Sequence, residues 1–192
     1  MLCPISGTDR KLDAYLAAAA RTGDRKALAA LVARWHKRLA AHAARLTGNT
    51  DAASDIVQDA WHEIIRAIAG LDDAGAFPAF AYRIVSRRAA RFIAGEISRR
   101  RLAGAIAAEP EPEPDTPKDV FDGDVDRLRR AIRNLPAPQR AAIALFYFDE
   151  LSVGEIAVAL DVPAGTVKTR LMHARQKLRE TLNGEIHERE RY

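Results

Sequence analysis

The chain has 192 residues, of which 48% are hydrophobic, 29% charged and 6% aromatic, and its formal net charge is +4. This composition is that of one globular domain or two small ones, and it excludes disorder of the whole chain. A single cysteine, Cys3, excludes an internal disulfide framework and metal sites built from several cysteines. No apolar run approaches the roughly 20 residues of a membrane span, and the N-terminus lacks the apolar core of a signal peptide. We therefore expect a cytoplasmic protein without membrane insertion.

The sequence predicts an all-α fold, because Ala, Leu, Arg and Glu are abundant and no alternating β-strand or hairpin pattern occurs. Loop chemistry at Thr22-Gly23, Gly48-Asn49 and Gly70 to Pro78 separates the first four expected helices. The expected helices cover 9–21, 24–47, 51–69, 78–102, 125–134, 137–148, 153–160 and 163–182.

Charge is strongly segregated between two neighbouring stretches. Residues 83–102 hold seven arginines and one acid, whereas residues 105–126 hold eight acids and one base. In the second stretch, prolines at alternate positions from 110 to 114 prevent a helix, and like charges extend the chain. We expect a flexible, acidic, Pro-rich linker over 104–124. It would join an N-terminal domain (1–103) to a C-terminal domain (125–192), and it leaves their relative placement open.

The C-terminal domain has the pattern of a helix-turn-helix. Ser152 and Glu155 fit a capping box for the first helix, and Pro163 suits the start of the second. In the second helix one face is apolar and the opposite face is polar and basic, with no acid between 163 and 179. Such a helix suits the DNA major groove, although a solvated face of an ordinary bundle helix is the alternative. The outward residues are Lys168, Thr169, Met172, His173 and Gln176, flanked by Arg170 and Arg175.

The same segment resembles region 4 of bacterial sigma factors, with the extracytoplasmic-function (ECF) group as the nearest. The resemblance rests on Leu135-Pro136-x-x-x-Arg140, on Glu155-Ile156-Ala157, and on the run from Val162 to Leu171 followed by Ala174-Arg175. It implies that the second helix reads the −35 promoter element. The seven outward and flanking residues are then the −35 DNA-binding candidates, with Lys168, Thr169, Met172 and His173 nearest the bases. The family often has arginine at the position of His173.

Residues 51–66 resemble the polymerase-binding helix of sigma region 2, through the pattern D-x-x-x-D-I-V-Q-D-x-W. Apolar residues four apart are expected to face the core, leaving an acidic row at Asp51, Asp55 and Asp59. The resemblance implies that Asp55, Gln58 and Asp59 contact the clamp helices of the polymerase beta-prime subunit. The alternative is that these acids only solvate the helix or favour its N-terminal end.

The loop and helix that follow resemble the ECF motif S-F-R-T-W-L-Y-R-I-A-x-N. Phe77, Tyr82, Arg83 and Ile84 match it, while Pro78, Phe80 and Arg87 depart from it. Arginines at 83, 87 and 91 form one stripe with Arg88 beside it, which suits a phosphate track, because so many like charges repel one another without an anionic partner. A solvated helix is the alternative, and the aromatic residues are expected in the core. The resemblance implies that this loop and helix bind the −10 promoter element. The −10 DNA-binding candidates are then Asp72, Asp73, Phe80, Arg83, Arg87, Arg88 and Arg91.

We expect no catalysis, small-molecule substrate, cofactor or metal. Arg66 replaces the second histidine of an H-E-x-x-H motif, and no phosphate-binding or dinucleotide glycine motif occurs. A stand-alone DNA-binding regulator would leave the polymerase-like helix without a role, and an interaction module that titrates another regulator would make the basic recognition face accidental. The resemblance implies an ECF sigma factor that binds core RNA polymerase, directs promoter-specific transcription initiation and promoter opening, and is controlled by an anti-sigma factor.

Overall fold

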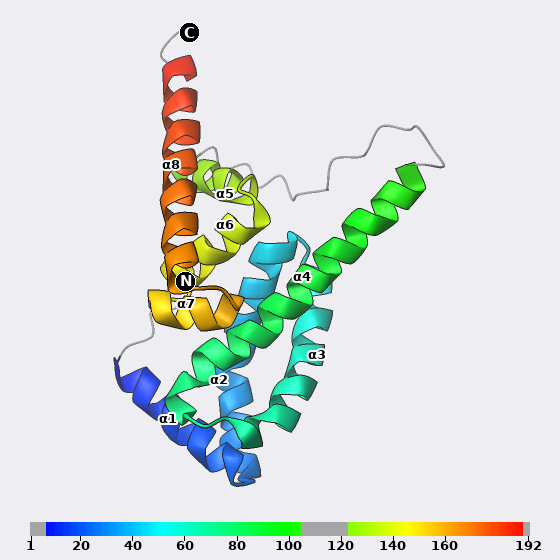
Figure 1. Ribbon diagram of the computed structural model, residues 1–192, viewed down its shortest axis with the longest axis vertical. Coiled ribbons are helices and arrows are strands. Elements are labelled where there is room, and N and C mark those ends of the chain that lie inside the picture. The colour runs from blue at the N-terminus through cyan, green and yellow to red at the C-terminus, as the bar shows by residue number, and fades with distance from the viewer. Residues whose placement is uncertain (1–6, 105–122, 190–192) are drawn as a thin grey trace.

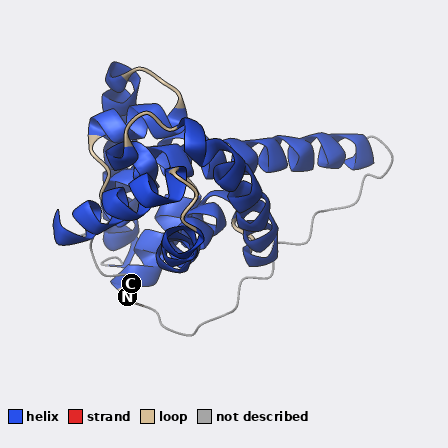
Figure 2. Ribbon diagram, turned by 90° about the horizontal axis from the view of Figure 1, so that it is seen from below, coloured by secondary structure: helices blue, strands red, loops and turns tan. Residues whose placement is uncertain are grey.

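The computed structural model describes residues 7–104 and 123–189, and every regular element in these ranges is a helix (Figure 2). The all-α prediction is confirmed. None of the described helices combines the length and apolarity needed to cross a bilayer. The predicted linker falls almost wholly outside the described residues. The elements are α1 (Gly7–Arg21), α2 (Arg25–Thr47), α3 (Thr50–Ala67), η1 (Ile68–Gly70), η2 (Ala74–Ala76), α4 (Phe77–Gly104), α5 (Asp124–Arg133), α6 (Ala137–Ile143), η3 (Ala144–Phe148), α7 (Val153–Leu160) and α8 (Ala164–Arg189).

Local capping explains why the helix boundaries lie close to those predicted. The Asp24 carboxylate accepts hydrogen bonds from the backbone N–H groups of Lys26 and Ala27, which starts α2. Gly48 ends α2 with a left-handed φ of 71°, a conformation that costs a residue without a Cβ little. Asn49 then caps α3 by accepting from the N–H of Ala52. These interactions involve residues at most a few positions apart, so the helix boundaries can be predicted from the sequence alone.

Two elements differ from the prediction. The expected helix over 137–148 continues after Ile143 as the π-helical turn η3, in which the N–H of Asp149 donates to the carbonyl of Ala144. The last helix continues to Arg189 rather than ending near residue 182. Gly184 does not end the helix, because one glycine in a helix costs only about 1 kcal/mol and the residues that follow include the helix-favouring Glu185 and Glu188.

The core of the N-terminal domain forms around Trp35 of α2. Its ring meets Phe77 and Tyr82 of α4 edge-on, with centroids 5.5 and 5.8 Å away, and all three side chains are buried. Burial, and to a smaller extent the charge of Asp149, raise the pKa of Tyr82 well above its ordinary value, so the phenol stays neutral. Phe77 and Tyr82 are therefore structural, as expected for the aromatic residues.

The C-terminal domain is docked on the N-terminal domain. Figure 1 shows α7 lying across α4, while the far end of α4 projects beyond the rest of the fold. Arg10 of α1 also reaches this domain, donating to the Glu155 carboxylate and to the carbonyl of Glu150, each at 2.9 Å. Burial acts to raise the pKa of Glu155, but hydrogen bonds with Ser152 and the charge of Arg10 outweigh it and leave the pKa lowered. Only the tertiary structure shows this placement.

Candidate nucleic-acid interface

Helix α8 has the two faces that the sequence predicts. Val167, Leu171 and Ala174 are buried. The first helix of the helix-turn-helix, α7, begins at a capping box, in which the Glu155 N–H donates to the Ser152 hydroxyl and the Ser152 N–H donates to the Glu155 carboxylate. The following turn passes through Asp161, whose left-handed φ is 54°. The burial of Val167, Leu171 and Ala174 therefore leaves the polar face of α8 outward.

Most of the predicted −35 residues lie on the open side of α8. Those classed as exposed are Lys168, Thr169, Met172, His173, Arg175 and Gln176. The Thr169 hydroxyl donates to the carbonyl of Gly165, and the Gln176 amide donates to Glu180. Arg170 differs because it is half-buried and lines a groove of about 420 Å³ between α4 and the C-terminal domain. The docked arrangement therefore draws Arg170 away from the outward face.

Arg175 has aromatic partners that the sequence did not indicate. Its Nε donates to the Tyr147 hydroxyl at 2.9 Å, and its guanidinium carbon lies 5.4 and 5.6 Å from the ring centroids of Phe146 and Tyr147. The π-helical turn η3 carries both rings. These contacts fix the direction of the Arg175 side chain beside the exposed face of α8.

The acidic row on α3 is exposed, as its periodicity predicts. Ile56, Ala60 and Ile64 are buried against the core. Asp51, Asp55, Gln58 and Asp59 point to solvent. The exposed acids are therefore available to a basic partner, apart from Asp59, which already pairs with Arg88 of α4.

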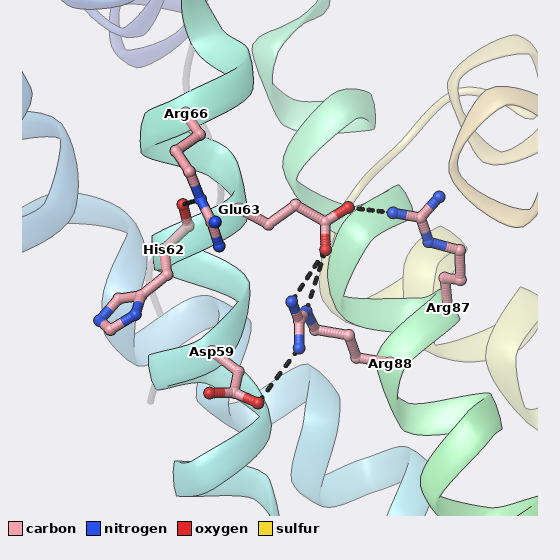
Figure 3. Close-up of polar contacts among 6 residues, drawn as sticks. All are labelled: Asp59, His62, Glu63, Arg66, Arg87 and Arg88. Carbon is pink, nitrogen blue, oxygen red and sulfur yellow. Dashed lines mark hydrogen bonds and ion pairs between the residues drawn. The ribbon is translucent and has the colours of Figure 1, made fainter.

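Figure 3 shows an ion-pair cluster that joins α3 to α4. The Glu63 carboxylate accepts from Arg87 and, at 3.0 and 3.1 Å, from Arg88, while Asp59 accepts from Arg88 at 3.1 Å. Arg66 turns away and donates to the carbonyl of His62. The expectation that the arginine stripe lacks anionic neighbours is therefore incomplete, because it counted acids near in sequence and not those on the packed helix.

Two further arginines of α4 have acidic neighbours. Arg83 pairs with Asp161 of the C-terminal domain at 3.2 Å. Arg99 pairs with Glu96 of the same helix. Arg91 is exposed and lines a shallow pocket with Asp55, Arg88 and other residues of α3 and α4. The −10 candidates on α4 thus lie in a mixed-charge surface rather than a purely basic one.

The loop before α4 places the remaining −10 candidates. Asp72 and Asp73 are both exposed. The Asp73 carboxylate accepts from the N–H of Gly75 at 2.8 Å and so caps η2, and the backbone carbonyl of Asp72 accepts from Arg21. Phe80 is half-buried, with its ring 6.5 Å from Phe77. Phe80 is thus partly accessible at the edge of the loop, whereas Asp73 is already engaged.

Sequence reasoning missed two residues that organise this surface. Glu63 lies one helical turn after Asp59, so its place in the acidic row of α3 was a usable signal. Arg140 was noted only as part of the family pattern; its guanidinium donates to the carbonyls of Arg133 and Leu46, and burial lowers its pKa. Across the described ranges no group of three or more potential metal-ligating side chains is assembled.

Two family models match the chain, one in each domain. The Sigma-70 region 2 model matches residues 31–98, which include α3 and most of α4. The Sigma-70 region 4 model matches residues 126–178, which include the helix-turn-helix. Together they cover most of the described chain and coincide with the two surfaces described above.

Curated relatives agree with the family models. The ECF RNA polymerase sigma-E factor of Escherichia coli K12 is 29% identical over 181 residues, covering 89% of this chain and 94% of the relative. The same-named protein of Haemophilus influenzae is 28% identical over 176 residues, covering 86% and 93%. The similarity therefore extends through both domains.

Solved structures show a related fold. CnrH, in a complex with the cytosolic domain of CnrY, has a TM-score of 0.66 at 25% identity and covers 90% of this chain and 98% of its own. The sigma factor RpoE of Bartonella quintana, in a complex with the anti-sigma factor NepR, has a TM-score of 0.62 at 24% identity, covering 79% and 94%. Both family models, the curated relatives and the fold agree: the chain belongs to the ECF sigma factors, which are transcription initiation factors and not enzymes.

Proposed function

We propose that this chain binds core RNA polymerase and directs initiation at promoters by recognising both a −35 and a −10 element. The N-terminal domain, residues 1–103, provides the polymerase and −10 contacts, and the C-terminal domain, residues 125–192, provides the −35 contact. The acidic segment 104–124 connects them. Chemistry belongs to the polymerase, and this chain supplies binding and orientation.

The observation that carries this proposal is the exposed polar face of α8 behind a buried apolar face. Lys168, Met172 and His173 project from one side of a helix whose other side is fixed to the domain core. A helix held in this way can enter the major groove and present side chains to base edges. The side chain of Arg175, at the border of this face, is suited to phosphates.

The polymerase contact is assigned to the exposed acids of α3. Asp55 and Asp59 with Gln58 lie on a single exposed helix face, which suits a basic helical partner. Control by an anti-sigma factor is part of the same proposal. It is supported by the solved relative RpoE, which was captured with the anti-sigma factor NepR.

In vitro transcription with purified bacterial core RNA polymerase and a library of promoter sequences tests the function. The full chain is expected to convert core enzyme, which alone starts nonspecifically, into an enzyme that enriches one family of templates. A chain that neither binds core polymerase nor enriches any template contradicts the proposal. Specific DNA binding by the chain without any effect of polymerase would instead indicate a stand-alone regulator.

A matched set of variants assigns the −10 surface. Replacing Arg83, Arg87 and Arg91 together with glutamine is expected to slow promoter opening and to reduce its dependence on salt, because fewer phosphate contacts release fewer counterions. Replacing Arg99, Arg100 and Arg101, on the same helix but farther from the loop, removes the same charge. If both triple variants behave alike, the assignment of the first three arginines is wrong.

A further inference from the structure

Tyr147 holds an arginine at the border of the exposed face of α8. Its hydroxyl accepts a hydrogen bond from Arg175 Nε at 2.9 Å, and the guanidinium carbon lies 5.6 Å from the centroid of its ring. The Phe146 ring is a second wall, with its centroid 5.4 Å from the same carbon and 5.0 Å from the Tyr147 centroid, at an interplanar angle of 75°. The Arg175 guanidinium therefore contacts two nearly perpendicular rings, while a hydrogen bond fixes one of its N–H groups.

The π-helical turn η3 gives both rings a rigid base. Ala144 and Leu145, at its start, are completely buried, whereas Tyr147 is 53% exposed. The N–H of Asp149 donates to the carbonyl of Ala144, and the N–H of Leu151 donates to the carbonyl of Leu145. Such turns are rare and frequently occur at functional sites. Here the turn leaves the Tyr147 side chain at the surface on a backbone that is anchored in the core.

The partners of Arg175 are neutral, which distinguishes it from the arginines of α4. Arg83 and Arg87 pair with carboxylates. Among the residues that the structure describes, no carboxylate pairs with Arg175. A phenol hydroxyl and an aromatic ring orient a guanidinium without neutralising its charge, and the N–H donors on both Nη atoms are left for a ligand. Arg175 is thus oriented in advance for an anion, and it breaks no ion pair when it binds one.

Arg175 shares a stripe of α8 with two residues assigned to the −35 element. Lys168, Met172 and Arg175 are spaced i, i+4 and i+7, and all three are exposed. Arg175 is rotated by about 20° from Lys168 around the helix axis and lies about 10 Å farther along it. The N-terminal part of a recognition helix contacts the base edges. A side chain two turns later on the same stripe therefore lies toward the edge of the major groove, which is about 12 Å wide.

We propose that Tyr147 is a positioning residue for DNA binding: with Phe146 it holds the Arg175 guanidinium in the orientation that binds one backbone phosphate at the edge of the −35 element. This inference rests on the proposed function and adds to it a residue outside α8. A guanidinium with both Nη groups unpaired matches two oxygens of one phosphate. Because a phosphate contact carries no sequence information, the effect of Tyr147 on affinity requires Arg175 and is equal on any duplex.

A double-mutant cycle on the full chain tests this coupling. The variants are Tyr147→Phe, Arg175→Gln and their combination, and fluorescence anisotropy measures their affinities over a range of salt concentrations. Two labelled duplexes of equal length are used. One carries the upstream element of the templates enriched by the transcription selection, and the other has that element scrambled. Tyr15→Phe on α1 is the matched control, because it removes the same hydroxyl from a tyrosine that is 70% exposed in the other domain.

The two positions are expected to differ in their salt dependence. Arg175→Gln should weaken binding of both duplexes on the order of 10-fold at low salt and reduce the salt slope by about one counterion. Tyr147→Phe keeps the ring and the charge, so it should weaken both by about 3-fold with an unchanged slope. In the Arg175→Gln background the same change should have no further effect. Tyr15→Phe should match the parent.

NMR of isotope-labelled arginine side chains gives a second readout that needs no DNA. The Nε–H of Arg175 is expected to exchange slowly with water in the parent, because it is hydrogen-bonded to Tyr147. In Tyr147→Phe it should exchange rapidly. A lower melting temperature of Tyr147→Phe with an unchanged exchange rate would show that the hydroxyl only supports the fold, which overturns the positioning role.

Three binding results also overturn the inference. They are an unchanged affinity in Tyr147→Phe, an equal loss in both backgrounds, and a loss in Arg175→Gln confined to the enriched element, which would show that Arg175 reads a base. Failure of the proposed function gives a different pattern. A chain that binds both duplexes equally lacks −35 recognition, while the cycle still decides whether Tyr147 acts through Arg175. A chain that binds neither refutes the phosphate contact as well, and the exchange rate then decides only whether Tyr147 holds Arg175.

Discussion

Glu63 offers a sharp test of how the basic surface of α4 is restrained. Its carboxylate is the common acceptor for Arg87 and Arg88 (Figure 3), and its side chain is 26% exposed. Glu63→Gln keeps the shape but removes the charge, which releases Arg87 and leaves Arg88 with only its pair to Asp59. Half-exposed ion pairs contribute about 0–1 kcal/mol each, so we expect unfolding to become easier by about 1 kcal/mol. For a chain of this length that lowers the melting temperature by roughly 2–4 °C.

The same change is expected to strengthen DNA binding. An arginine that must leave Glu63 before meeting a phosphate loses the energy of the existing pair, and about 1 kcal/mol corresponds to roughly a 5-fold change in affinity. Fluorescence anisotropy with a labelled −10 single strand at low salt measures it. Asp51→Asn is the matched control, because Asp51 is an exposed acid on the same helix and no arginine pair with it is seen among the described contacts.

Equal gains in affinity for Glu63→Gln and Asp51→Asn would refute the reasoning, because net charge would then explain both. A gain confined to Glu63→Gln, with the melting temperature reduced as expected, supports the release of Arg87 and the weaker retention of Arg88 by the remaining Asp59 pair. The comparison needs no promoter of known sequence, since the phosphate contribution to affinity is independent of sequence.

Three further outcomes are expected. Asp55→Lys combined with Asp59→Lys should weaken binding to core polymerase by at least about 10-fold through like-charge repulsion, with an unchanged helical circular-dichroism spectrum; undiminished core affinity would show that the acidic row is only a solvated face. Lys168→Ala combined with His173→Ala should reduce transcription from a −35-dependent template by roughly 10-fold or more, given about 1–3 kcal/mol per base contact, without lowering the melting temperature, and equal activity would argue against the recognition face. The folded-state pKa of Glu155 is lowered from 4.5, so the stabilisation that its ionised carboxylate provides is complete above pH 4.5 and is lost as the pH falls through the folded-state pKa. The melting-temperature difference between the parent and Glu155→Gln should therefore shrink in acid, and a constant difference would contradict this.

Much of the candidate site was predictable because its determinants are local. The buried positions of Val167, Leu171 and Ala174 follow from helical periodicity, and the same periodicity exposes Asp55 and Asp59. The partners of the arginines were not predictable in this way. Glu63 is 24 residues before Arg87, so its contact depends on how α3 packs against α4.

The sequence by itself determined the helices, their caps and their polar and apolar faces, because these depend on side chains within a few positions of one another. It also indicated the family, through motifs in residues 51–66, in the loop and helix that follow, and in residues 135–175. Only the tertiary structure decided where the two domains lie and which charges neutralise one another. His42 and Asp149 are 107 residues apart, and Arg83 and Asp161 are 78 apart. Pairs so distant in the chain meet only after the domains dock, so no periodicity or local charge count contains them.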